Sequence, residues 1–295
     1  MINIKIPATS ANIGSGFDSL GLALGLYNYV FIDEHDGIAI SAMDNSDIPA
    51  GEDNLVFSTA KHLYDVCGRK FSGLKIHQQN NIPMTRGLGS SSACIVAGLV
   101  GANQLLGCPL AMGDIVDMAA MLEGHPDNST PALLGGLVTA VIDAGKVYYV
   151  KQELSSQLKF AAIIPDFELK TSYSRSLLPK ALPHSDAVYN LSRSALMSVS
   201  LYSGNFQNLR VAALDKVHQP YRLGLIEHSE EIFAAAYDFG AYSTYLSGGG
   251  PTLISILDSR IADFESKMRG FLNSIGLAGW GIQILDVDNS GTVIF

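Results

Sequence analysis

A glycine- and serine-rich segment in front of a long apolar stretch carries the clearest chemical signal in the sequence. Gly87 and Gly89 precede three consecutive serines at 90 to 92, and the apolar run that follows to Gly107 predicts a buried helix. Glycine lets the backbone approach an anion closely, and the first turn of a helix presents unpaired N–H groups together with the positive end of its dipole. The segment therefore predicts a phosphate-binding loop, although a tight turn followed by a serine cap would use the same residues.

Two better-known nucleotide motifs do not explain this chain. It contains no GxxxxGK[ST], so the loop is not a Walker A loop and any nucleotide is bound without that lysine. Residues 238 to 240 spell the Asp-Phe-Gly magnesium motif of protein kinases, but the HRD and VAIK segments of those kinases are missing. We therefore interpret this tripeptide as the end of a helix.

A polar, glycine-punctuated segment near the N-terminus offers groups for a polar substrate. Residues 7 to 24 contain Asn12 and a single carboxylate, Asp18, before the apolar pattern resumes. An amide both donates and accepts hydrogen bonds, and a carboxylate attracts an ammonium or a hydroxyl group. Both side chains could orient a substrate. An Asx-rich loop that caps a helix near Asp18 is the alternative.

A third polar segment follows an expected helix over residues 112 to 123. Glu123 ends that helix, and His125, Asp127 and Asn128 form a polar corner with a proline between them. Mg²⁺ in phosphoryl-transfer sites is usually held by one or two protein oxygen ligands and by the substrate phosphates, which makes Glu123 a candidate metal ligand. A helix C-terminus with a solvated carboxylate and a proline-containing turn is the alternative.

Composition limits the class of protein. A chain of 295 residues with 47% hydrophobic and 16% charged residues can bury a large core, in two domains or in one large one. A net charge of −9 offers no basic surface to nucleic acid or to an anionic membrane. The three cysteines show no metal-binding spacing, and neither a signal peptide nor an apolar span is evident. We expect a reduced, cytoplasmic protein.

Strands and helices are expected to interleave without strict alternation, which favours an α+β fold. A polar pattern at residues 149 to 156 predicts a domain boundary, and Thr171 and Arg175 lie four residues apart on an expected short helix. The expected strands are 2 to 7, a pair within 27 to 41 that turns near Asp36, 159 to 165, 241 to 247, 252 to 257, 281 to 286 and 292 to 295. Residues 50 to 68 are expected to form a loop that enters a helix ending at Gly68, and further helices are expected at 186 to 202, 206 to 214, 222 to 238 and 261 to 273.

Three motifs in this order, PATSANIGSGFD, GLGSSSA and SGGGPT, resemble those of the GHMP small-molecule kinases. Within that superfamily, the opening motif together with EGHPDNSTPALLGG resembles the homoserine kinase family, over nearly the whole chain. The resemblance implies an ATP-binding, ribosomal-protein-S5-like domain at residues 1 to 152 and a ferredoxin-like domain at residues 153 to 295. ATP and substrate would lie between the two.

The resemblance also implies an activity, which is Mg²⁺-dependent transfer of phosphate from ATP to the side-chain hydroxyl of L-homoserine in threonine biosynthesis, by a homodimer. Asn128 and Glu123 would be catalytic, and Ser91 and Glu123 would hold the metal. The other implied contacts are with ATP, from Asn54, Leu55, Val56, Pro83, Arg86, Gly87, Leu88, Gly89, Ser90, Ser91 and Ser92, and with substrate, from Asn12, Asp18, His125, Asn128, Thr171, Arg175 and Arg222.

The charges suit an amino acid, because Asp18 can bind the ammonium group while Arg175 and Arg222 hold the carboxylate by forked hydrogen bonds. Two alternatives stay open, a GHMP kinase that acts on mevalonate or a sugar, and a non-catalytic relative that senses nucleotide. The chain departs from the family pattern at Ser15, where a proline is common, and in the short spacing between Glu123 and His125, which puts the geometry of the metal site in question. Asp127 could be mistaken for a base, although the resemblance implies catalysis without one.

Overall fold

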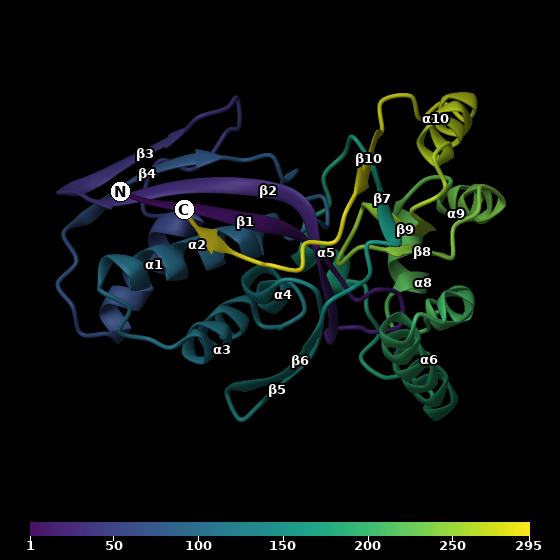
Figure 1. The fold of residues 1–295 in the computed structure, drawn as a ribbon, viewed down its shortest axis with the longest axis horizontal. Helices are drawn as coiled ribbons and strands as arrows, with labels where there is room; N and C mark the ends of the chain where they lie inside the picture. Colours follow the sequence, from purple (N-terminus) through teal and green to yellow (C-terminus); the bar gives the residue numbers. More distant parts are fainter.

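The computed structural model describes residues 1 to 295 and contains two β-sheets (Figure 1). The first half of the chain forms most of the larger sheet, and the second half forms the smaller one. Each sheet is covered by helices. A hydrophobic cluster of 45 buried residues extends from the larger sheet to one face of the smaller sheet, and a second cluster of 15 lies between the smaller sheet and its helices. The architecture is α+β, as the sequence predicted. No helix combines the length and the apolar character needed to cross a bilayer.

The larger sheet has seven strands and is mostly antiparallel, in the order β11-β1-β2-β4-β3, with β5 pairing with β2 and β6. In β1, alternate side chains such as Ile4 and Ile6 enter the core, as the alternating sequence predicted. The strands are β1 (Ile2–Ala11), β2 (Leu20–Glu34), β3 (Gly37–Ala42), β4 (Gly73–Gln79), β5 (Leu137–Asp143), β6 (Lys146–Gln152) and β11 (Val293–Ile294).

Two expectations for this sheet were wrong. The two strands expected within residues 27 to 41 form on either side of a turn near Asp36, but they do not pair with each other, because β2 and β3 each pair with β4, and β3 runs parallel to it. The polar loop expected from Thr9 to Asp18 starts later, because β1 continues to Ala11, and the chain enters β2 at Leu20. Thr9 and Ser10 lie within β1 and are fully buried. Their polar side chains had favoured a loop at these positions.

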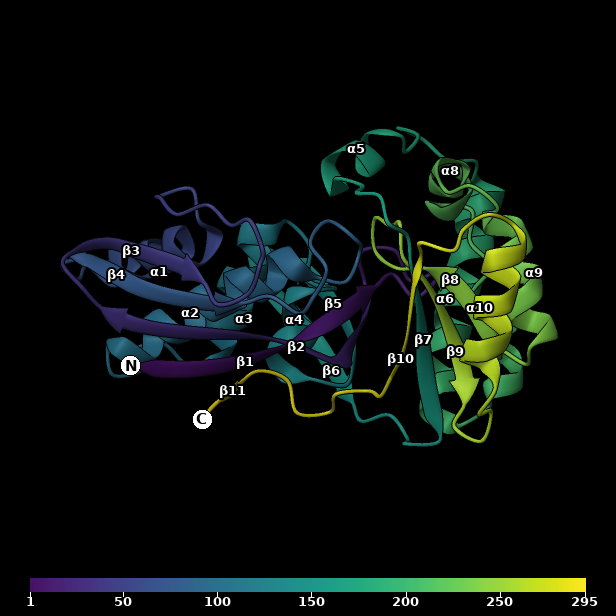
Figure 2. The same ribbon diagram turned by 90° about the horizontal axis from the view of Figure 1, so that it is seen from above.

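Four helices cover one face of the larger sheet (Figures 1 and 2). They are α1 (Leu55–Val66), α2 (Ser90–Leu105), α3 (Met112–Glu123) and α4 (Ser129–Leu134). The apolar α2 packs against α1, α3, α4, β1 and β2, which explains why its sequence is apolar on every side. Asn54 caps α1 through its side-chain oxygen, which accepts from the N–H groups of Val56 and Phe57.

The smaller sheet is antiparallel in the order β10-β7-β9-β8. Its chain order, strand, helices, two strands, helix, strand, is that of a ferredoxin-like fold. Helices α6, α9 and α10 cover the face turned away from the larger sheet (Figure 2). The elements are β7 (Leu158–Ile164), α6 (His184–Ser203), α9 (Ser229–Asp238), β8 (Ser243–Leu246), β9 (Leu253–Asp258), α10 (Phe264–Ser274) and β10 (Gly281–Leu285).

Short helical segments complete the second half of the chain, and two of them carry residues that the sequence placed near the substrate. They are α5 (Thr171–Ser176), α7 (Leu209–Ala212), α8 (Gln219–Arg222) and two 3-10 turns, η1 (Phe206–Asn208) and η2 (Leu223–Leu225). The helix expected over residues 222 to 238 is broken, because Arg222 ends α8 and α9 starts only at Ser229. The expected short helix with Thr171 and Arg175 is α5.

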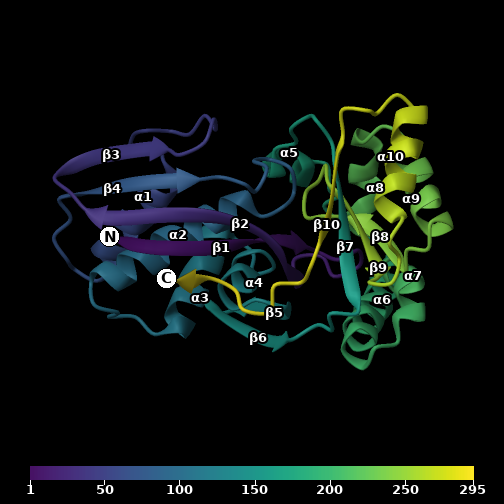
Figure 3. The same cartoon turned by 45° about the horizontal axis from the view of Figure 1, so that its top comes forward.

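The C-terminal segment returns to the larger sheet. The chain passes from β6 to β7 between residues 152 and 158, but β11 pairs with β1 through Ile4 opposite Ile294 and Lys5 opposite Val293. Both termini therefore lie close together on the larger sheet (Figure 3). The domain division at residues 152 and 153 stays a prediction, and the last strand belongs with the first part of the fold.

Candidate active site

A cleft of about 330 Å³ lies where the N-terminus of α2 meets the loop after β1, the α3–α4 connection, α5 and the glycine loop between β8 and β9. Most of the residues that the sequence singled out line it: Asn12, Asp18, Leu55, Arg86, Gly87, Gly89, Ser90, Ser91, Ser92, Glu123, His125, Asn128, Thr171, Arg175 and Arg222. Residues more than 200 positions apart in the chain thus share one concave surface.

The glycine- and serine-rich loop has the geometry of an anion cradle. Gly87 and Gly89 have φ angles of 76° and 72°. A Cβ atom at Gly89 would lie 1.9 Å from Thr9 Oγ1, and one at Gly87 would lie 2.5 Å from the Ser247 carbonyl oxygen, so neither position tolerates a side chain. The N–H groups of serines 90 to 92 at the start of α2 have no hydrogen-bond partner within the protein. They are free to bind phosphate oxygens.

Other residues of the implied ATP site hold the loop in place or lie beneath it. Arg86 donates through Nε to the Pro165 carbonyl at 3.1 Å and through a terminal nitrogen to the Asp166 carbonyl at 3.0 Å, which ties the loop to the smaller sheet. Four of the implied residues do not line the cleft, namely Asn54, Val56, Pro83 and Leu88. Val56 and Leu88 are buried in the core, so a nucleotide could meet only their backbone atoms.

Glu123 is a carboxylate without a cation partner, because no lysine or arginine pairs with it. Its oxygens accept hydrogen bonds from Ser92 Oγ and, at 3.1 Å, from the Ser129 N–H group. Burial raises the pKa of Glu123 against the opposing effects of His125 and of these hydrogen bonds. A carboxylate beside a serine hydroxyl offers the kind of oxygen ligands that a hard divalent cation takes. Ser92 contacts Glu123, whereas Ser91 lies exposed in the cleft.

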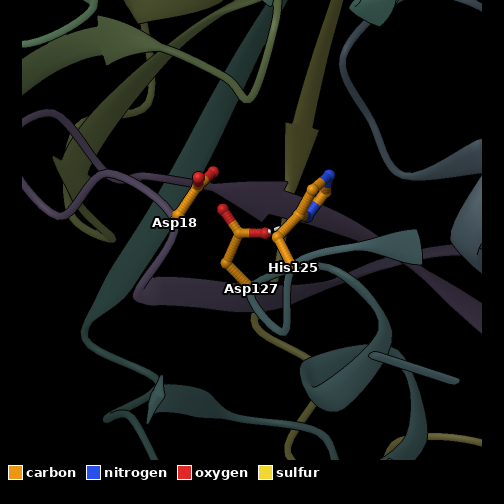
Figure 4. A group of neighbouring side chains, drawn as sticks. All are labelled: Asp18, His125 and Asp127. Carbon is orange, nitrogen blue, oxygen red and sulfur yellow. Dashed lines mark hydrogen bonds and ion pairs between the residues drawn. The ribbon is translucent and has the colours of Figure 1, made fainter. Parts of the chain in front are cut away.

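His125, Asp127 and Asp18 meet beside this carboxylate, with ligand atoms all within 4.8 Å of one another (Figure 4). His125 Nδ1 lies 2.6 Å from Asp127 Oδ1. Burial alone would lower the pKa of His125, but the hydrogen bond and charge of Asp127 and the charges of Glu123 and Asp18 outweigh it and raise the pKa to about 9. His125 and Asp127 therefore form an ion pair at neutral pH.

Asp18 and Arg175 form a forked ion pair across the cleft. The two terminal nitrogens of Arg175 donate to the two Asp18 oxygens at 2.9 and 2.7 Å. This hydrogen bonding outweighs desolvation and raises the pKa of Arg175. Asp18 lies in the loop between β1 and β2 and Arg175 on α5, so the pair joins the two halves of the fold. Both side chains stay partly exposed to the cleft.

Arg222 is buried, with only 1% of its surface exposed, although it lies at the end of a short helix. Its Nε donates to the Ser174 carbonyl at 3.3 Å, and NH1 donates to the Gly248 carbonyl at 3.1 Å and contacts His218 Nδ1 at 3.3 Å. NH2 has no partner in the protein and is the nitrogen left for a ligand. Burial and the nearby charge of Arg175 lower the pKa of Arg222 to about 10, so it stays charged at neutral pH.

Two asparagines in the cleft are fixed by hydrogen bonds. Asn12, at a φ of 69°, donates to the Gly248 carbonyl at 2.9 Å and accepts from the Asp18 N–H at 3.0 Å. Asn128 Oδ1 accepts from Thr9 Oγ1 at 2.8 Å, so its amide NH₂ group is available to the cleft. Thr171 lies beside the glycine loop, where a Cβ atom at Gly249 would approach its Cα to 3.5 Å.

Three residues that hold side chains of the site in place, Thr9, Phe17 and His218, were not predicted from the sequence. Thr9 orients Asn128, and the aromatic ring of Phe17 lies 5.4 Å from the guanidinium carbon of both Arg175 and Arg222. His218 stacks on the same ring. The only signal for His218 was its position four residues before Arg222, a spacing that places two side chains on one face of a helical turn. Nothing in the sequence indicated that Thr9 faces the phosphate loop.

Comparisons with known proteins agree with this geometry. The family model for the N-terminal domain of GHMP kinases matches residues 54 to 136, and that for the C-terminal part of GHMP kinases matches residues 193 to 273. Homoserine kinases from Caldicellulosiruptor saccharolyticus and Clostridium beijerinckii are each 45% identical over all of this chain and over 97% and 98% of their own lengths.

Solved structures give the same assignment. The crystal structure of homoserine kinase from Cytophaga hutchinsonii matches with a TM-score of 0.88 at 28% identity, over all of this chain and 97% of its own. The mevalonate kinase of Methanococcus jannaschii matches with a TM-score of 0.71 at 16% identity, over 97% of this chain and 98% of its own, and at that identity shows a shared fold alone. With identity of 40% and more to full-length relatives, and with both kinase domains present, the chain belongs to the homoserine kinase family of the GHMP kinases.

Proposed function

We propose that this protein transfers the γ-phosphate of ATP to the side-chain hydroxyl of L-homoserine and forms O-phospho-L-homoserine, the step that leads toward threonine. The observation that carries the proposal is the placement of opposite charges, Asp18 beside Arg175 and Arg222, in the same cleft as the free N–H groups of α2. A zwitterionic amino acid needs both charges, and a phosphate donor needs those N–H groups.

The phosphates of ATP would lie on the loop from Gly87 to Ser92, with the free N–H groups of serines 90 to 92 as donors. Glu123, together with a serine hydroxyl, would hold Mg²⁺. Ser91 is the serine implied by the family resemblance, and Ser92 is the one that contacts Glu123 in this structure. Held by these residues, Mg²⁺ would supply positive charge that neutralises the phosphates of ATP.

Homoserine would enter between Asp18 and Arg175 and exchange their mutual contact for two contacts with itself. Its ammonium group would bind Asp18, and its carboxylate would bind Arg175 and the free NH2 of Arg222. Asn12 holds the Asp18 loop, and the NH₂ group of Asn128, which the contact with Thr9 leaves free, would face the reacting hydroxyl. Thr171 and His125 complete the pocket wall.

None of the three carboxylates that line the cleft is left as a free base, since Asp18 is paired with Arg175 and would bind the substrate ammonium group. Asp127 is 1% exposed and bound to His125, and the Glu123 oxygens are engaged by Ser92 and Ser129. The loose transition state of phosphoryl transfer needs little deprotonation of the nucleophile, so alignment and charge neutralisation supply most of the rate enhancement.

An assay of ADP release with homoserine, mevalonate, galactose and shikimate as acceptors tests the proposal. Turnover of homoserine alone, with dependence on Mg²⁺, is expected. Turnover of mevalonate without homoserine would instead assign the chain to another GHMP activity, and tight ATP binding without turnover of any acceptor would indicate a nucleotide sensor. The homodimer and the cytoplasmic location stay predictions. Light scattering, which measures the mass of the particle in solution, tests the first.

A further inference from the structure

His218 is a fully buried histidine whose two ring nitrogens have different partners. Nε2 lies 2.7 Å from the carbonyl oxygen of Gly14, and Nδ1 lies 3.3 Å from NH1 of Arg222. A carbonyl oxygen only accepts a hydrogen bond and a guanidinium only donates one. Nε2 must therefore carry the proton while Nδ1 offers a lone pair, which is one defined neutral tautomer.

The surroundings of His218 favour this neutral form. The ring stacks on Phe17 with centroids 5.2 Å apart and planes at 27°. Burial lowers the pKa of His218, the charge of Arg222 lowers it further, and Asp215 and Asp18 act in the opposite direction. Asp215 Oδ2 lies 3.6 Å from Nε2, but Asp215 already accepts from the N–H groups of His218 and residue 219 at 2.8 and 2.6 Å.

We propose that His218 is a positioning residue, whose neutral Nδ1 holds the Arg222 guanidinium so that NH2 faces the substrate carboxylate. The inference rests on the proposed homoserine kinase activity. Arg222 is a long side chain with several rotatable bonds, and its other two acceptors, the carbonyls of Ser174 and Gly248, lie on α5 and on the glycine loop. His218 is the only side chain that accepts a hydrogen bond from it, and it also fixes the Asp18 loop through Gly14.

Protonation of His218 would remove this contact. The new N–H at Nδ1 would point at NH1, and two cations would face each other in a buried site, with Arg175 as a third over the same Phe17 ring. Because burial keeps the pKa of His218 below its ordinary value, the protein reaches this state only in acid. The KM for homoserine should then rise as the pH falls below the ordinary titration range of histidine, while the KM for ATP stays nearly constant.

A matched pair of variants separates positioning from packing. His218→Asn places an amide oxygen near the Nδ1 position and keeps the acceptor for Arg222, whereas His218→Gln places an amide nitrogen near the Nε2 position and keeps only the donor to Gly14. We expect His218→Gln to raise the KM for homoserine about tenfold or more and His218→Asn to raise it less than about threefold, with kcat and the KM for ATP little changed in both. The rise of KM in acid should be absent from His218→Asn.

Equal KM values in the two variants, or an acid rise that survives in His218→Asn, would overturn the inference. If both variants fold poorly, nitrogen-15 NMR of histidine in the parent protein decides, because a proton on Nδ1 of His218 at neutral pH contradicts the proposed contact and a proton on Nε2 alone supports it. A parent protein that does not phosphorylate homoserine at all would refute the proposed function, an outcome that the acceptor assay reveals before any variant is made.

Discussion

Arg175 donates two parallel hydrogen bonds, of 2.9 and 2.7 Å, to the carboxylate of Asp18, although the substrate is expected to contact the two residues separately. The carboxylate proposed for the ammonium group and a guanidinium proposed for the carboxylate neutralise each other in the free protein. A zwitterion can replace both partners at once, since it brings one charge of each sign. A substrate with a carboxylate alone would leave Asp18 without a partner, which gives the cleft a physical basis for preferring amino acids.

Loss of either member of this pair should weaken homoserine binding with little effect on stability. We expect Asp18→Asn and Arg175→Ala each to raise the KM for homoserine by about 10- to 100-fold, because each removes a charge-assisted contact. The unfolding free energy should change by about 1 kcal/mol or less, since 41% of the Arg175 side chain and 32% of the Asp18 side chain are exposed. Steady-state kinetics and denaturant unfolding measure the two effects.

The ion pair between Lys267 on α10 and Asp263, the residue before that helix, has a distance of 2.7 Å, lies outside the cleft and provides the control. Lys267→Ala should leave homoserine kinetics within about twofold of the parent, as expected for a surface substitution. If Arg175→Ala behaved in the same way, the assignment of Arg175 to substrate binding would have to be withdrawn.

Glu123→Gln should impair the chemical step. The amide keeps the shape of the side chain and its contacts with Ser92 and Ser129 but lacks the charge that holds Mg²⁺. We expect kcat to fall about 100-fold or more, with the Mg²⁺ concentration for half-maximal rate raised. Glu230→Gln, at an exposed position on α9, is the control for a charge change of the same kind. Unchanged kcat and Mg²⁺ dependence in Glu123→Gln would argue against this metal site.

Arg222 should be sensitive both in binding and in stability, because it is buried and holds three groups of the protein. Arg222→Ala should raise the KM for homoserine by the equivalent of about 2 to 4 kcal/mol and lower the melting temperature, with the KM for ATP little changed. Arg222→Lys should recover only part of the loss, because a point charge cannot replace the guanidinium fork. Homoserine kinetics within about twofold of the parent in both variants would refute the role.

Thr9 should act on the rate through Asn128. Thr9→Val removes the hydroxyl that donates to Asn128 Oδ1 at 2.8 Å while it keeps the branched shape against Gly89. The freed amide can rotate, so we expect kcat to fall about tenfold and the KM for ATP to change little. Thr9→Ser retains the hydroxyl and should restore most of kcat. Equal rates for the valine and serine variants would show that packing, and not the hydrogen bond, is what matters at this position.

Local signals in the sequence determined the short-range features of this protein. The glycines and serines from Gly87 to Ser92 specify a tight turn and a helix start because backbone conformation is a local property. The same holds for the capping of α1 by Asn54 and for the strands on either side of the glycine loop at residues 247 to 251. The ordered motifs then identified the family, and with it the two-domain fold and the activity class.

Only the tertiary structure decided how these pieces meet. It paired β3 with β4, returned β11 to β1, joined Asp18 to Arg175 and buried Arg222 against His218. Such contacts span tens to hundreds of residues, and they depend on which sheet edge, helix end or carbonyl lies opposite, which no local pattern records. His218 shows most clearly what a local pattern cannot record, since the hydrogen bond that places the proton on its Nε2 is accepted by Gly14, 204 positions away in the chain.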